Sequence, residues 1–243
     1  MKDYFSRDSK AYAKHRPVYP HELFEYVKSY CSEKETAWDC ATGNGQAAVE
    51  LSKIFKTVIG TDISSNQLEA AAQKENIYYH LTGISCPAEN NTVDLITVAQ
   101  ALHWLPLNEF YREVKRVSKP AGIIAVWSYG LLTVNDITCR IILNFYENVL
   151  KGCWDEQRKH VDDGYKNIDF PFREIGSPSF RITVQWTLEQ LTGYINTWSA
   201  ILPYKNKYGT DPIAVLTDDL KNVWGDQIQK VIFPLQLKMG YVH

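Results

Sequence analysis

The chain has 243 residues and a formal net charge of −2, so no excess of positive charge would draw it to nucleic acid or to an anionic membrane. Its hydrophobic content of 45% and charged content of 22% are those of a soluble globular protein. The aromatic content of 13% suits either a large core or a pocket that closes over a small molecule. We expect one domain, 1–243, with neither nucleic-acid nor membrane partners.

The five cysteines are scattered and show no C-x-x-C spacing, so we expect neither a disulfide framework nor a metal site. The N-terminal stretch MKDYFSRDSKAYAKHRPVYP is charged throughout and lacks the apolar region of a signal peptide. No apolar run approaches the ~18 residues that a membrane span needs. These features predict a cytoplasmic protein.

Residues 1–35 are expected to form an N-terminal lid segment followed by a helix. Pro20 opens the stretch PHELFEYVKSY, whose apolar residues fall on one helical face. Ligands of parallel α/β sheets bind beyond the carboxyl ends of the strands, where such a segment can close over them.

Residues 36–127 alternate short β-rich runs with helical patterns. Between the runs, QAAVELSKI, SSNQLEAAAQKE and NEFYREVKRVSK carry apolar residues at helical spacing. Ser64 and Asn108 are the expected N-caps of the second and third of these helices. The alternation predicts right-handed βαβ units and a doubly wound, parallel sheet. The expected strands are 36–41, 56–61, 77–81, 92–98 and 121–127.

In residues 128–243 the regular alternation of strand and helix patterns ends. This part of the sequence predicts helical insertions together with the last strands. A helix is expected near 135–151, a strand at SFRITVQW, a helix at TLEQLTGYINTWSA and another that Asp211 caps before Pro212. The stretch QKVIFPLQLKMGYV reads as the last strand. Its Pro234 predicts an edge position or a bulge, because proline cannot donate to a strand ladder.

The stretch AWDCATGNGQAA, 37–48, predicts a nucleotide-binding turn after the first strand. Gly43-x-Gly45-x-x-Ala48 fits the loose dinucleotide fingerprint, in which a pyrophosphate lies at a helix N-terminus. Asp39, at the end of the strand, disfavours a pyrophosphate and suits a ligand that carries an amino group or a sulfonium. Asp62 ends the second strand, where a carboxylate accepts hydrogen bonds from ribose hydroxyls of either nucleotide.

The pattern Asp39-x-Ala41-x-Gly43-x-Gly45 resembles the D/E-x-G-x-G-x-G signature of class I S-adenosylmethionine-dependent methyltransferases, with Ala41 in place of the first glycine. The resemblance implies S-adenosylmethionine as cofactor. It also implies a Rossmann-like, doubly wound, mostly parallel seven-stranded sheet with an antiparallel last strand and helical lid insertions. The region 36–127 would then be the cofactor-binding core.

Further segments resemble the same family in the same order. CPAEN resembles the segment beside the adenine, and DLITVAQALHW resembles the fourth strand and the loop that faces the methyl group. FSRDSKAYAKHRPVYP, AQALHWL and TWSAILPY resemble a small-molecule subgroup that includes trans-aconitate methyltransferase-like proteins. The cofactor contacts that the resemblance implies are Tyr12, Arg16, Asp39, Ala41, Thr42, Gly43, Gly45, Asp62, Ile63, Gln67, Ala88, Glu89, Gln100 and Ala101.

The resemblance implies O-methylation of an organic acid by in-line methyl transfer. A carboxylate nucleophile is already ionised at neutral pH and needs no general base, whereas an amine or a phenol would use one, for which His103 is the candidate. The loop AQALHW lacks the N/D-P-P-Y/F motif of enzymes that methylate DNA adenine or protein glutamine. The expected acceptor contacts are Trp104, Trp127, Tyr129, Trp198 and Arg173, although the aromatic members could belong to the core instead.

Two other interpretations remain open from the sequence. The glycine pattern also permits an NAD(P)-dependent oxidoreductase, against which the acidic end of the first strand counts. A non-catalytic protein that binds S-adenosylmethionine or its demethylated product is the second alternative. The sequence leaves the oligomeric state open.

Overall fold

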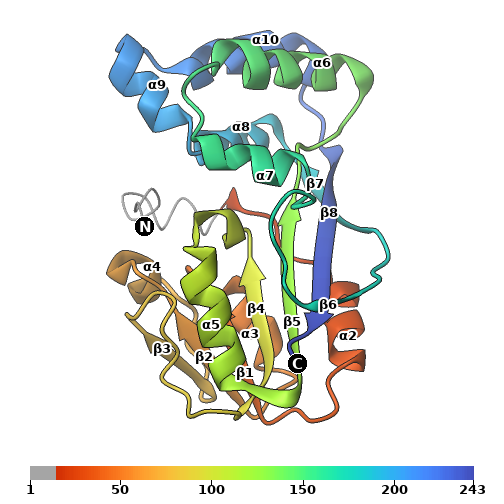
Figure 1. The fold of residues 1–243 in the computed structure, drawn as a ribbon. Coiled ribbons are helices and arrows are strands. Elements are labelled where there is room, and N and C mark those ends of the chain that lie inside the picture. The colour runs from red at the N-terminus through yellow and green to blue at the C-terminus, as the bar shows by residue number, and fades with distance from the viewer. Residues whose placement is uncertain (1–14) are drawn as a thin grey trace.

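The computed structural model describes residues 15–243, which form an α/β fold around a mostly parallel sheet (Figure 1). Five parallel strands lie in the order β3-β2-β1-β4-β5. The chain builds outward from β1 in both directions, so the sheet is doubly wound as the sequence predicts. The five strands are β1 (Thr36–Cys40), β2 (Thr57–Thr61), β3 (Ile77–His80), β4 (Val93–Ala99) and β5 (Ser118–Tyr129).

A long antiparallel strand, β8 (Gln229–Tyr241), extends the sheet beyond β5. The other edge of β8 pairs with β6 (Arg173–Ile175) and β7 (Phe180–Trp186), both antiparallel to it. The expected antiparallel last strand is confirmed. The described sheet has eight strands rather than seven. The additional strand β6 spans three residues, which is too short for a periodic sequence pattern to reveal.

Pro234 was expected at an edge position or a bulge. It is paired with β7 on one side, and on the other side it lies just beyond the ladder with β5, which ends at Leu235. Pro234 pairs with Arg181 of β7, and its carbonyl accepts the N–H of Gly130 at 3.0 Å. In an antiparallel strand the N and C=O of one residue face the same neighbour, so the proline nitrogen faces β5. The paired part of β5 ends at Tyr129, and the ladder therefore requires no donor there.

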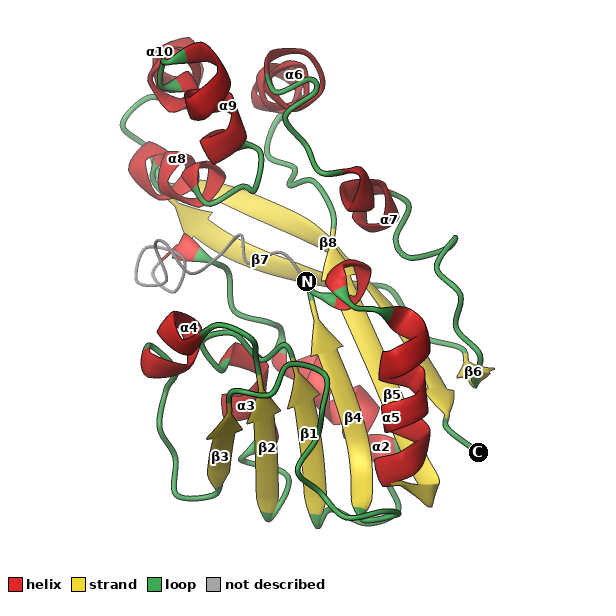
Figure 2. Cartoon of the chain, turned by 60° about the vertical axis from the view of Figure 1, so that its left-hand side comes forward, coloured by secondary structure: helices red, strands yellow, loops and turns green. Residues whose placement is uncertain are grey.

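Helices cover both faces of the parallel strands (Figure 2). On one face α2 (His21–Ser29) and α3 (Gln46–Leu51) share a hydrophobic cluster with Ile123, Ala125 and Trp127 of β5. On the other face α5 (Leu107–Val117) packs with Ile124 and Val126. The alternation along β5 thus divides its side chains between two cores.

The helix starts follow the predicted caps with one exception. Ser64 caps α4 (Ser65–Glu69) by accepting the N–H of Gln67 at 3.2 Å, although α4 ends well before its sequence pattern does. Asn108 is not a cap. The helix α5 begins at Leu107 after Pro106, whose carbonyl accepts the N–H of Phe110 at 3.0 Å.

A helical layer lies beyond the carboxyl ends of the parallel strands (Figure 1). It comprises α6 (Asp136–Asn144), α8 (Leu188–Asn196), α9 (Ile201–Tyr208) and α10 (Pro212–Trp224), the last capped by Asp211 as predicted. The π-turn η3 (Phe145–Val149), the 3-10 turn η4 (Glu156–Arg158) and α7 (Lys159–Asp162) connect this layer to the sheet. No helix within residues 15–243 has both the length and the apolarity for a membrane span.

Candidate cofactor and acceptor site

The turn between β1 and α3 is tight and backbone-lined. Ala41 and Gly43 have φ values of 54° and 55°, in the left-handed region that favours glycine. Ala41 is therefore strained where the family signature has glycine. Gly45 has φ of 83°, and a Cβ there would collide with the hydroxyl of Tyr79. Tyr79 thus requires glycine at position 45, whereas Ala41, Gly43 and Asn44 are only partly buried and form the side of the turn that a ligand can approach.

Asp39 lies under this turn, with 1% of its surface exposed. The hydroxyl of Thr42 donates to one carboxylate oxygen at 2.5 Å, and that of Thr97 on β4 donates to the other at 2.7 Å. Burial raises the pKa of Asp39 to about 6, the two hydroxyl bonds lower it, and the nearby charge of Asp62 raises it further. Asp39 therefore places a carboxylate below the turn whose ionisation is less favourable than that of an exposed aspartate.

Asp62, at the carboxyl end of β2, joins the turn to the next loop. Its Oδ2 accepts the N–H of Gly43 at 2.8 Å, and its Oδ1 accepts the N–H of Ser64 at 2.9 Å. These two bonds fix the position of the Asp62 carboxylate beside the turn. Asp62 and the turn lie side by side, as the sequence predicts.

Ile63, Gln67 and Gly83 surround this carboxylate. Ile63 is 39% exposed, and its side chain packs against Gly83, whose N–H donates to the carbonyl of Asp62 at 3.1 Å. The Gln67 side chain lies beside Gly43. Gly83 was not among the predicted contacts. The Thr82-Gly83 pair directly after β3 is the signal that could have revealed it.

Ala88 and Glu89 do not lie at this site. The carbonyl of Ala88 accepts from Arg116 Nη1 at 3.0 Å, and Arg116 lies in the last turn of α5. Asn91 bonds to the carbonyl of Arg116, directly before β4 begins. The loop after β3 thus passes the cofactor edge at 82–85 and descends to the amino end of β4 before it reaches Ala88. The sequence resemblance was placed a few residues too late.

Gln100 and Ala101 follow β4 at the carboxyl edge. Gln100 has φ of 57°, and its Oε1 accepts the N–H of Tyr129 at 2.9 Å. Its own N–H donates to the carbonyl of Trp127 at 2.8 Å. Gln100 therefore joins the ends of β4 and β5 and directs Ala101 into the 3-10 helix η2 (Leu102–Trp104).

His103 lies within η2 and is buried. Its Nδ1 is 3.0 Å from the hydroxyl of Tyr165, and its ring contacts the ring of Trp104 at a centroid distance of 4.5 Å. Burial, and after it the charges of Arg158 and His160, lower the pKa of His103 to about 3. His103 is therefore neutral at physiological pH and a weak base. Tyr165, which holds it, is 62 residues distant in sequence and was not predicted.

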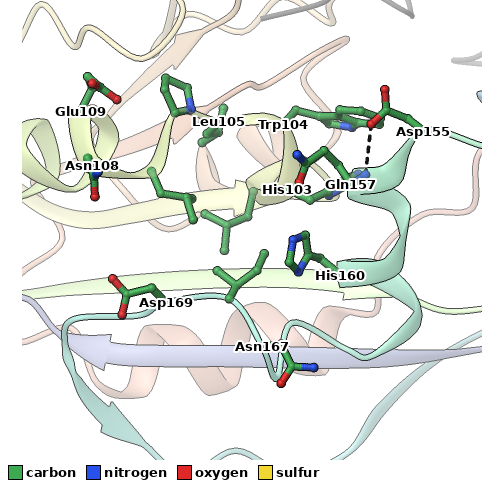
Figure 3. A pocket seen from close by; sticks show the side chains of 14 residues that line it. His103, Trp104, Leu105, Asn108, Glu109, Asp155, Gln157, His160, Asn167 and Asp169 are labelled. Carbon is green, nitrogen blue, oxygen red and sulfur yellow. Dashed lines mark hydrogen bonds between the residues drawn. The ribbon is translucent and has the colours of Figure 1, made fainter.

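Trp104 and His103 line a pocket of about 720 Å³ between η2 and the α7 segment. Figure 3 shows His103, Gln157 and His160 close together on one side of this pocket, with Asp169 farther along it. The pocket begins directly after β4, so Trp104 remains a candidate acceptor contact.

The other predicted aromatic contacts belong to the core. Trp127 is fully buried and meets Phe24 of α2 at a centroid distance of 5.8 Å. Tyr129 is 3% exposed, and Trp198 is 6% exposed. The odd-numbered side of β5 faces α2, so Trp127 and Tyr129 pack between the layers, and Trp198 packs among Phe145, Tyr146 and Trp154.

Arg173 does not reach the site either. It pairs in register with Tyr241, which in turn pairs with Ile123 near the start of β5, whereas the site lies at the opposite end. Its guanidinium lies over the Tyr241 ring at 4.4 Å.

Two predicted cofactor contacts precede α2. Tyr12 falls outside the described residues. Arg16 lies at the correct edge, where its Nη1 donates to the Tyr129 hydroxyl at 2.8 Å.

Comparison with known proteins identifies the family. A family described as a methyltransferase domain matches residues 38–126. A Dictyostelium discoideum protein that carries a methyltransferase name is 34% identical over 247 residues, which cover 97% of this chain and 93% of that protein. The chain belongs to the class I S-adenosylmethionine-dependent methyltransferases.

The structural likeness extends over nearly the whole methyltransferase. A solved structure named as a type II methyltransferase from Anaeromyxobacter dehalogenans has a TM-score of 0.87 at 30% identity, covering 93% of this chain and 98% of that one. A methyltransferase-named protein of Schizosaccharomyces pombe is 28% identical, over 84% of this chain and 82% of that protein. These likenesses do not favour the oxidoreductase alternative.

S-adenosylmethionine is the cofactor of the methyltransferase, and the residues at the edge of the sheet suit it. Asp62 ends β2 with a carboxylate, the group that accepts hydrogen bonds from ribose hydroxyls in this fold. Ile63 offers an exposed apolar side chain for a base, and the buried charge of Asp39 suits a cationic tail. When bound, the cofactor supplies a methyl group activated by a sulfonium. The chain itself must bind it, orient the acceptor and exclude water.

Proposed function

We propose that the methyltransferase transfers the methyl group to a carboxylate oxygen of a small organic acid bound beneath the helical layer. The resemblance to trans-aconitate methyltransferase-like proteins supports this acceptor class. The position of the helical layer beyond the carboxyl ends of the strands supports an enclosed acceptor of small size.

The low pKa of the buried His103 is the main support for this proposal. An amine or a phenol acceptor loses a proton during methylation, and a base with a pKa of about 3 removes it poorly at neutral pH. A carboxylic acid has a pKa of about 4 and is already ionised there, so it requires no base. His103 therefore acts as a structural partner of Tyr165 rather than as the catalytic base that the sequence suggested.

The remaining task of the protein is alignment. Asp62 and the backbone of 41–45 would hold the cofactor at the ends of β1 and β2, and Gln100 fixes the end of the neighbouring strand β4. Reacting atoms held about 3–3.5 Å apart make an in-line displacement effectively unimolecular. Exclusion of water by the helical layer strengthens the electrostatic contacts on which the alignment depends.

Labelled methyl transfer tests the proposal. With S-[methyl-³H]adenosylmethionine and a panel of organic acids, we expect transfer to at least one acid, and the product label should be released as volatile methanol by mild base, as a methyl ester requires. Asp62→Ala, which loses the ribose contacts but no core packing, should abolish transfer. Label that is stable to base would identify an N-, C- or ether-methylated product and contradict the proposal.

A further inference from the structure

Arg158, at the end of η4, is a mostly buried cation near the proposed acceptor site. Its side chain is 19% exposed. The guanidinium lies over the ring of Trp154 at 5.3 Å and that of Tyr146 at 5.5 Å. Its Nε is 3.0 Å from the Tyr146 hydroxyl and 3.2 Å from Asp162 Oδ1. One edge and one face of the guanidinium are thus fixed.

The other edge of the guanidinium is unused. Within residues 15–243, Nε makes both of the side-chain hydrogen bonds of Arg158, and Nη1 and Nη2 have no protein acceptor. Arginine cannot lose its proton, and Nη1 and Nη2 are not fully buried, so an anionic ligand can reach them. The Nη1/Nη2 pair also has the planar fork that matches the two oxygens of an oxyanion.

Arg158 lies near the carboxyl end of β4, because η4 packs against η2, the turn that follows β4. The two rings beside its guanidinium contact Trp198, which also meets Tyr194 of α8 at a centroid distance of 6.0 Å. Arg16 stacks on the Tyr194 ring at 5.2 Å. One cluster of aromatic rings therefore joins Arg158 to the segment that meets the end of the sheet. The charge of Arg158 also contributes to the lowered pKa of His103 in η2.

We propose that Arg158 is a specificity-determining residue that binds an oxyanion of the acceptor through Nη1 and Nη2. The inference rests on the proposed function and extends it. A guanidinium draws electron density from the oxygens that it binds and makes them poorer nucleophiles. The anchored oxyanion is therefore separate from the carboxylate that is methylated, and the acceptor carries at least two anionic groups. The anchored group is a second carboxylate or a phosphoryl group.

The two aromatic rings against the guanidinium of Arg158 favour its role in binding an anion. Trp154 and Tyr146 cover one face of the guanidinium and limit its hydration, which strengthens its attraction for an anion. Arg173 is the matched contrast, because it also stacks on a tyrosine but lies on the far edge of the sheet with its side chain exposed. An oxyanion bound at Arg173 could not approach the cofactor turn.

Titration calorimetry tests the proposal on protein saturated with S-adenosylhomocysteine. The probes are dicarboxylates from malonate to adipate, 3-phosphonopropionate, and the monomethyl ester of each dicarboxylate. We expect at least one dianion to bind wild type, at least about tenfold more tightly than its monoester. Arg158→Gln should weaken that dianion about 10- to 100-fold, the loss expected for a charge-assisted pair. Arg158→Lys should fall in between, and Arg173→Gln should match wild type.

The outcomes separate the two proposals. Unchanged affinity of the dianion in Arg158→Gln, equal binding of dianion and monoester, or no binding of any dianion would overturn the role of Arg158. The methyl-ester proposal would survive the first two if labelled transfer to a carboxylate were still observed. Binding of S-adenosylhomocysteine must stay within about twofold of wild type in both Arg158 variants, which shows that the cofactor site is intact. Preference for the phosphonate over the dicarboxylates would identify the anchored group as phosphoryl.

Discussion

Asp39 and Asp62 are two carboxylates at neighbouring strand ends with different environments. The oxygens of Asp62 bond backbone N–H groups, whereas those of Asp39 bond hydroxyl groups under a closed turn. Asp62 is thus positioned to accept hydrogen bonds from hydroxyl groups. Ionisation of the Asp39 carboxyl costs free energy when no cofactor is bound. A cationic ligand above the turn would recover part of that cost.

Asp39→Asn should alter how stability depends on pH. The pKa of Asp39 is raised from 3.8 to about 6, so the folded state favours the protonated acid. The resulting stabilisation is full below pH 3.8 and is lost as pH rises through 6. Relative to wild type, the variant should therefore gain about 2–3 kcal/mol in free energy of unfolding between pH 4 and pH 7. Urea denaturation of the cofactor-free protein at each pH measures this gain.

An exposed position without a titratable group provides the control. Leu202 is 42% exposed, and a Leu202→Ala variant should give a curve of stability against pH that runs parallel to wild type. If the Asp39→Asn curve also ran parallel, the buried carboxylate would not be the titrating group.

At the scale of elements, the connection between η3 and α8 depends on Trp198. This ring meets Tyr146 and Trp154 at centroid distances of 5.6 Å and Tyr194 at 6.0 Å. Tyr146 and Trp154 also stack on Arg158, so the packing of the helical layer and the position of this guanidinium are coupled.

Trp198→Ala should mainly destabilise the protein. Removal of a buried tryptophan side chain costs about 3–5 kcal/mol, which would appear as a lower midpoint of urea denaturation. Leu202→Ala on α9, where the side chain is 42% exposed, should change stability by about 0.5 kcal/mol or less. A raised KM at unchanged stability would instead restore Trp198 to the acceptor site.

The sequence predicted those parts of the site that depend on local geometry. Gly43, Gly45 and Asp62 are recognisable because a tight turn and a strand end impose their residue types within a few positions. Trp127 packs against Phe24 of α2, a contact between distant parts of the chain that its own sequence context does not reveal. The proposed role of Arg158 depends on how η3 and η4 fold together, which no sequence motif marks. Ala88 was misplaced because nothing in the loop after β3 marks where it leaves the carboxyl edge.

At the scale of the whole molecule, Arg16 links three parts of the chain. Its Nη1 donates to the hydroxyl of Tyr129 on β5, its Nη2 donates to the carbonyl of Thr197 after α8, and it stacks on Tyr194. The segment before α2, the sheet and the helical layer therefore meet at one side chain. Its predicted contact with the cofactor stays a prediction.

Arg16→Met should loosen the helical layer. Loss of charge-assisted hydrogen bonds costs about 1.5–3 kcal/mol, and each kcal/mol lowers Tm by about 2–4 °C in a domain of this size. Hydrogen exchange should accelerate in α8 while β1 and β4 stay protected. Arg16→Lys keeps the charge but cannot bond to Tyr129 and Thr197 through two separate nitrogens, so the acceleration of hydrogen exchange should be smaller. Uniform acceleration across the sheet would show that Arg16 supports the fold as a whole.

The length of β8 has a consequence for how the molecule folds. This strand unites β5, β6 and β7, and its pairing with β5 joins residues more than a hundred positions apart. Such distant pairings slow folding, because a long loop must close before the contacts form. Until then β5 presents an unpaired apolar edge to other chains. A fragment that stops before residue 229 should therefore aggregate, even though it would retain the whole cofactor turn.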